Sequence, residues 1–171
     1  MQAVSMDDII RRSLTSFAAE ALASDWRGRR EREAVSLFAF GHLLREVRAE
    51  GALYDPAQIT IEFPVPQVTG RDGVPASTKS QVCKDLVIWS HPGMTCWDEA
   101  GKPTVPPAAI LEWKFGLPTV YEPDVEWLQA FTKLYPETVG YAITANRPGG
   151  GLLLECVRVA EGVAEREWLR V

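Results

Sequence analysis

The sequence predicts an α/β protein in which a central mixed sheet carries helices on both faces. Two observations support this fold class. Stretches with apolar residues at helical spacing alternate along the chain with short apolar runs of the length of buried strands. The expected order is helix, helix, three strands, helix and further strands, which is typical of a sheet between helices. The 171 residues are most simply one domain, long enough for a sizeable core.

Two helices are expected before the first strand. Residues 6–23 carry apolar side chains at helical spacing. Ser24 and Asp25 then offer an N-cap for a second helix, and Gly51 is well placed to end it. One apolar stripe runs along this second helix and consists of Leu37, Phe40, Leu44 and Val47.

Three strands are expected next, each an apolar run bounded by prolines, glycines or small polar residues. They cover residues 58–65, 81–89 and 108–115. A helix follows over 124–135, with Pro123 near its start. Further strands are expected over 138–144 and 151–159, and the tail 163–171 is a candidate edge strand.

Composition excludes several classes of protein. A chain with 46% hydrophobic and 24% charged residues is not expected to be disordered or collagen-like. Cys83, Cys96 and Cys156 lie far apart and form no CxxC pair, which argues against a structural zinc site and a disulfide scaffold. The acidic start at Asp7 and Asp8 is unlike a signal peptide, and no apolar run reaches the roughly 18 residues of a membrane span. The sequence therefore predicts a cytoplasmic protein without a membrane partner.

Two of the expected core strands carry charged residues. Residues 84–89 (KDLVIW) contain Asp85, and residues 109–116 (AILEWKFG) contain Glu112 and Lys114. Burying such groups is costly unless they are paired or hold a metal, so their presence favours a functional site. Alternate side chains of a strand share a face, which puts Glu112 and Lys114 side by side. If the two strands pair, Asp85 lies opposite Glu112, and two carboxylates and a lysine share one pocket.

Paired carboxylates of this kind are typical of a metal site. Two close carboxylates repel each other and raise each other's pKa. A divalent cation relieves the repulsion, and all-oxygen ligands suit Mg²⁺ or Mn²⁺. Magnesium commonly takes one or two carboxylates and completes its shell with water and substrate phosphate. The pattern therefore predicts magnesium or manganese at Asp85 and Glu112.

These motifs resemble the PD-(D/E)xK nuclease superfamily. The matching residues are Asp85, the E-x-K of Glu112 and Lys114, and Gly116 with a helix after it. The order of elements over about residues 30–145 is similar to the common core of that family. The resemblance implies a three-layer α/β/α restriction-endonuclease-like fold with a central mixed sheet, to which an N-terminal helix and C-terminal strands are added.

Two positions of the family pattern need comment. The family often has a glutamate on the first core helix. Glu33 matches best because it shares a helical face with Leu37, and Glu31 is the alternative. Lys84 stands where the family name expects proline.

By this resemblance the chain is expected to be a Mg²⁺-dependent nuclease, an endonuclease with DNA as the favoured substrate. Asp85 and Glu112 would bind the metal, Glu33 would bind it through a water, and Lys114 would position the attacking water. Two other classes stay open. One is a non-catalytic interaction module on the same fold, within a defence or repair assembly. The other is an unrelated α/β ligand-binding domain whose charges are structural.

Basic side chains gather in the first turns of the second helix. The formal net charge of −5 does not indicate nucleic-acid binding, but a local basic patch is what meets phosphates. Positive charge is unfavourable at a helix N-terminus, so these arginines favour phosphate contact, with a solvated charge run as the alternative. They are Arg27, Arg29, Arg30 and Arg32. Further candidates are Arg71, Lys79, Lys102 and Arg147. The expected partners are DNA and either a second copy of the chain or another protein.

Overall fold

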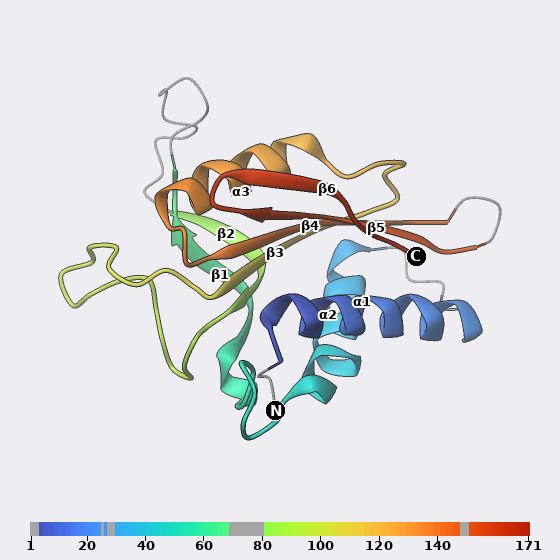
Figure 1. Cartoon of the computed structure of the whole chain (residues 1–171), viewed down its shortest axis with the longest axis horizontal. Coiled ribbons are helices and arrows are strands. Elements are labelled where there is room, and N and C mark those ends of the chain that lie inside the picture. Colours follow the sequence, from blue (N-terminus) through green and yellow to red (C-terminus); the bar gives the residue numbers. More distant parts are fainter. Residues whose placement is uncertain (1–3, 25, 27–29, 69–80, 148–150) are drawn as a thin grey trace.

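One mixed sheet forms the middle layer of the molecule (Figure 1). Helices α1 (Met6–Ala23) and α2 (Glu31–Gly41) lie on one face of this sheet, and α3 (Glu122–Leu134) lies on the other. This computed structural model describes residues 4–24, 26, 30–68, 81–147 and 151–171. None of the described helices is long and apolar enough to cross a membrane.

The described part of the chain contributes six strands to the sheet, in the order in which they occur in the sequence. They are β1 (Ile59–Pro66), β2 (Gln81–Ile88), β3 (Ala109–Phe115), β4 (Val139–Asn146), β5 (Leu153–Ala160) and β6 (Val163–Arg170). Strands β3 and β4 pair in parallel, and the other neighbours pair antiparallel. Helix α3 supplies the crossover that a parallel pair requires.

Each face of the sheet has its own core. The core under α1 and α2 contains Phe17, Phe38 and Trp113, whose ring centroids lie 5.2 to 6.3 Å apart. The core under α3 contains Trp89 and Phe131 together with aliphatic side chains of β3 and β5. Removing these large apolar side chains from water is the main favourable term in folding. Strand β3 is buried on both faces as a result.

Two glycines fit α3 to the sheet. A Cβ at Gly140 of β4 would lie 2.7 Å from Leu128 Cδ2, so only glycine allows this close approach of helix and strand. Gly116 has φ +86°, a conformation that L side chains rarely adopt. It follows β3 directly and turns the chain toward α3.

The predicted α/β class, with a mixed sheet between helices, is confirmed. All six expected strands occur within a few residues of their predicted positions. The predicted second helix was too long, however. Helix α2 ends at Gly41, and a short 3₁₀ helix (Leu43–Glu46) follows it. Glycine is a poor helix former, and it ends the helix ten residues before Gly51.

The predicted apolar stripe of that helix was also wrong. Phe40 is 65% exposed, and the buried residues of α2 are Ala34, Val35, Phe38 and Ala39. Ser24 caps the C-terminus of α1 and is not the N-cap of the second helix. The alternative N-cap, Asp25, lies outside the described residues.

Candidate active site

Strands β2 and β3 part in the middle of the sheet, at the residues that the sequence singles out. Their ladder pairs Ile88 with Ala109, continues for two more pairs and ends at Leu86 and Leu111. Pairing of β1 with β2 and of β3 with β4 continues past this level. The next residues along the two parted strands are Asp85 and Glu112.

The two carboxylates take over hydrogen bonds that the ladder no longer supplies. Asp85 Oδ2 accepts the backbone N–H of Trp113 at 2.8 Å. Glu112 Oε2 in turn lies 3.5 Å from the backbone N of Asp85. Buried backbone donors need partners, so each carboxylate is held in place by the opposite strand. The expectation that Asp85 lies next to Glu112 across these strands agrees with this geometry.

Glu112 also forms a buried ion pair with Lys84. Lys84 Nζ donates to Glu112 Oε1, and the two residues are 4% and 6% exposed. The same ammonium lies 3.5 Å from the ring centroid of Trp127 on α3, which is cation–π geometry. Burial raises the pKa of Glu112 to about 7, although Lys84 opposes the rise.

Lys114 lies among carboxylates from three elements. Its Nζ donates to the carbonyl of Trp113 at 2.8 Å. It also lies 3.5 Å from Glu31 of α2 and 3.5 Å from Asp124 of α3. Burial alone would lower the pKa of Lys114, but the carboxylates outweigh burial and raise this pKa, in the order Asp124, Asp85, Glu31 and Glu112. The side chain is therefore an ammonium at neutral pH.

The charges of this cluster do not balance. Four carboxylates surround two ammonium groups, which leaves two negative charges when all are ionised. Burial raises the pKa of Asp124 and that of Glu31, because both carboxylates lose solvation. Like-charge repulsion adds to each of these shifts. A cationic ligand would be favoured at such a site.

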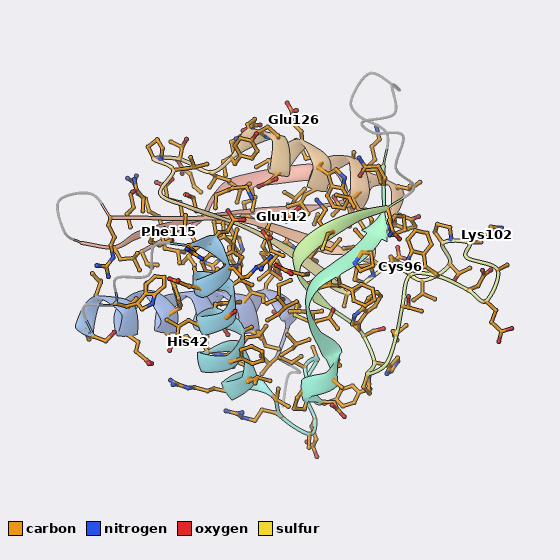
Figure 2. The ribbon with its side chains drawn as sticks, turned by 180° about the vertical axis from the view of Figure 1, so that it is seen from behind. His42, Cys96, Lys102, Glu112, Phe115 and Glu126 are labelled. Atoms are coloured by element: carbon orange, nitrogen blue, oxygen red, sulfur yellow. The ribbon has the colours of Figure 1, made fainter. Side chains whose placement is uncertain are left out.

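A pocket of about 530 Å³ opens on the α2 side of the cluster. Asp85 and Glu31 line it, together with two arginines, Arg30 and Arg32. The pocket is completed by Val35, Ile61, Glu62 and Cys83. Glu112 is not among the lining residues; it is buried in the interior of the molecule (Figure 2).

The structure brings Asp85, Glu112 and Lys114 together, as the strand pattern predicts. Of the two candidate helix glutamates, Glu31 contacts Lys114, whereas Glu33 occupies an exposed position on α2. Lys102 lies at the far end of the connection between β2 and β3, away from Glu112 (Figure 2).

The basic candidates fall into two groups. Arg30 and Arg32 line the pocket next to Asp85, and Lys102 and Arg147 also lie in the described part of the chain, with Arg147 Nη2 3.4 Å from the carbonyl oxygen of Ala21. The remaining ones lie outside the described residues and are Arg27, Arg29, Arg71 and Lys79.

Sequence reasoning missed two members of the cluster, Lys84 and Asp124. Lys84 is charged within an apolar strand, which was a usable signal, but alternation assigns it to the face opposite Asp85. Asp124 was interpreted as part of a helix start. The short connection from β3 to α3 could have indicated Asp124, because this connection brings the first turn of α3 back to the end of β3.

Asp85 and Glu112 are the residues that could hold a metal ion. Within the described ranges, no group of three or more histidine, cysteine, aspartate or glutamate side chains converges as a ligand set. Two carboxylates are nevertheless enough for Mg²⁺, which takes its other ligands from water and phosphate. Asp85 uses Oδ2 for its bond to Trp113 N–H, and Glu112 uses Oε1 for Lys84 Nζ while its Oε2 has only the long contact of 3.5 Å to the backbone N of Asp85. The donor set fits a hard divalent cation.

Comparisons of this chain with protein-family models, with curated proteins and with solved structures found no match. The geometry of the site therefore carries the functional argument.

Titration of Glu112 should make the metal-free protein less stable as the pH rises. Between pH 4.5 and 7 the folded chain holds a proton on Glu112 that the unfolded chain has lost, so the free energy of unfolding falls with increasing pH. The expected loss is about 3 kcal/mol for a shift of this size. Urea unfolding in EDTA across this range measures it.

Two variants complete this titration experiment. Glu112→Gln should unfold with a flatter pH dependence than the wild type, because its amide does not titrate. Glu126→Gln, an exposed position on α3, should retain the wild-type slope. Parallel slopes for the wild type and Glu112→Gln would contradict the raised pKa.

Proposed function

We propose that this chain is a metal-dependent nuclease that hydrolyses phosphodiester bonds, with DNA as the favoured substrate. The observation that carries the proposal is the parting of β2 and β3, which gathers Asp85, Glu112 and Lys114 and lets Asp85 line an open pocket. The resemblance of these residues to the PD-(D/E)xK pattern supports it, and the restriction-endonuclease-like fold is part of the same proposal. Mg²⁺ or Mn²⁺ is the proposed cofactor.

Asp85 would hold the cation through Oδ1, and Glu112 would hold it through Oε2, whose contact with the backbone N of Asp85 is long at 3.5 Å. When bound, the cation supplies charge neutralisation at the scissile phosphate and a lowered pKa for the attacking water. The excess of two negative charges in the cluster supports this role, because a divalent cation compensates it.

Lys114 acts as a fixed positive charge in this mechanism. In the metal-free protein its raised pKa keeps it protonated, which favours a role as hydrogen-bond donor over a role as general base. Asp124 and Glu31 orient the ammonium from opposite layers of the molecule. From this position Lys114 donates hydrogen bonds to water or phosphate oxygen and stabilises the negative charge that develops during hydrolysis.

Arg30 and Arg32 provide the route for the substrate. Both line the pocket next to Asp85, at the N-terminal end of α2. Guanidinium groups bind phosphate through charge-assisted hydrogen bonds. A nucleic-acid backbone that lies over this pocket would present a phosphate to Asp85, in spite of the acidic net charge of the chain.

A non-catalytic interaction module is the second candidate function. The buried ion pair of Lys84 with Glu112 favours it, because an ammonium already neutralises one of the two carboxylates. In that case the cluster is structural and the pocket receives a protein partner.

Manganese should stabilise the wild-type protein against heat. A cation at one hundred times its dissociation constant adds about 2.7 kcal/mol, which corresponds to roughly 5–10 °C in a chain of this length. Asp85→Asn should abolish the shift while it keeps an acceptor for Trp113 N–H. Differential scanning calorimetry with and without Mn²⁺ measures the effect, and Glu126→Gln should respond like the wild type. An equal shift in Asp85→Asn would place the cation elsewhere.

Nuclease activity should depend on the same side chains. Labelled single-stranded, duplex and branched DNA, and RNA, are incubated with the protein and Mg²⁺ or Mn²⁺. Asp85→Asn, Glu112→Gln and Lys114→Ala should each reduce the cleavage rate by at least about 100-fold, because each removes charge stabilisation at the reacting phosphate. Absence of cleavage in the wild type, combined with absence of stabilisation by metal, would favour the interaction module.

Arg30→Gln should weaken binding to DNA with little dependence on base sequence. Loss of one phosphate contact lowers the slope of log affinity against log salt by about one. Fluorescence anisotropy with the Asp85→Asn protein, across a range of salt concentrations, measures the slope without cleavage. Arg170→Gln, at the end of strand β6 and paired with Glu155 of β5, is the matched control. An unchanged slope in Arg30→Gln would exclude the pocket as the path of the phosphate backbone.

A further inference from the structure

Glu62 has an unusual backbone conformation within β1. Its φ is +53°, in the left-handed region that L side chains rarely adopt. Among the described non-glycine residues Glu161 also has positive φ, but Glu161 and Gly162 form the two-residue turn between β5 and β6, where such values are required. Glu62 lies inside an eight-residue strand and has no turn to explain it.

Side-chain alternation reverses at this residue. Ile59 and Ile61 pack against the core under α1 and α2, whereas Phe63 and Val65 belong to the core under α3. Residues two apart in a regular strand share a face. Strand β1 therefore turns over between Ile61 and Phe63, at Glu62.

Strand β2 turns over at the same level. Leu86 packs under α1 and α2, whereas Val82 packs under α3 and Lys84 contacts Trp127 of α3. The register stays constant, with Ile61 opposite Leu86 and Phe63 opposite Lys84. The intervening pair, Glu62 with Asp85, is missing from this ladder.

The reversal decides where the site residues point. Asp85 and Leu86 follow one another on the α2 side, so Asp85 lines the pocket. Lys84 emerges on the α3 side and meets Glu112. If β2 alternated regularly between Lys84 and Val87, Asp85 would lie on the α3 face together with Val87, and Lys84 would point to the α2 side.

The carboxylate of Glu62 fastens the reversed segment to α2. It forms an ion pair with Arg32 at 2.6 Å, and both residues line the pocket beside Asp85. Exposed pairs of this kind contribute little stability, so the backbone conformation is the main feature.

We propose that Glu62 is a positioning residue whose left-handed backbone turns over β1 and β2, so that Asp85 enters the pocket and Lys84 meets Glu112. Its consequence for catalysis rests on the proposed nuclease function. Its consequence for the direction of the side chains of β2 does not.

The stability of Glu62 variants tests the backbone conformation directly. In an ordinary strand valine stabilises and glycine destabilises. At Glu62 the order should be inverted, with Glu62→Gly melting at least roughly 3 °C above Glu62→Val, because glycine adopts positive φ freely and a β-branched residue does not. Glu62→Asn should resemble glycine, since asparagine tolerates this region. The usual order, valine above glycine, would overturn the proposal.

Thiol labelling reports the direction of the β2 side chains. Cys83 is exposed, and the other two cysteines, Cys96 and Cys156, are buried. Glu62→Gly and Glu62→Asn should label at the wild-type rate. If Glu62→Val folds, it should turn Cys83 toward the α3 core and label more than about tenfold slower, because a buried thiol reacts only after local opening. Wild-type labelling in a folded Glu62→Val protein would show that the residue does not set the direction of β2.

Cleavage assays separate this role from the nuclease proposal. If the wild type cleaves DNA, kcat should be lower in Glu62→Val than in Glu62→Gly and Glu62→Asn, because all three lack the carboxylate and only valine opposes the left-handed backbone. If the wild type does not cleave, the melting order and the labelling rates still decide the positioning role, while the nuclease proposal fails on its own.

Discussion

Charge buried between two parted strands is the constraint on which the rest of this structure depends. Glu112 lies in the core of the sheet, where an isolated carboxylate would be very costly. Two groups of β2 compensate it, the ammonium of Lys84 and the backbone N–H of Asp85. Both reach Glu112 only because β2 is turned over at this level. One structural unit therefore includes the ion pair of Lys84 with Glu112, the parting of β2 and β3, and the backbone of Glu62.

The two lysines join this unit to the helical layers. Lys84 lies against Trp127 and connects β2 to α3. Lys114 reaches Glu31 on one side and Asp124 on the other, and so connects β3 to both layers. Replacing one partner of such a buried contact leaves the other uncompensated, which costs more than the intact pair contributes. The cluster therefore holds its geometry through the packing of the whole domain core and not through one loop.

Strand periodicity was sufficient to predict the sheet and the neighbourhood of Asp85, Glu112 and Lys114. It failed for Lys84, because alternation assumes a regular strand and glutamate at position 62 carries no signal of positive φ. It also ranked the two candidate helix glutamates from an apolar stripe that the structure does not have. The assumed phase of α2 favoured Glu33, but burial of Val35 and Phe38 puts Glu31, one turn before Val35, toward the sheet. The error came from the assumed apolar stripe, which included the exposed Phe40.

The charge balance favours the proposed catalytic interpretation over the structural one. A structural ion pair needs one ammonium for one carboxylate, and Lys84 with Glu112 already satisfies that need. Around Lys114, however, three further carboxylates gather from three elements: Glu31, Asp85 and Asp124. Burial raises the pKa of Glu31 and of Asp124, and repulsion from neighbouring carboxylates adds to both shifts, so the ionised cluster is unfavourable in the isolated protein. Such an arrangement is explained if a cation completes it, with Lys84 as the group that allows Glu112 to stay buried until the cation binds.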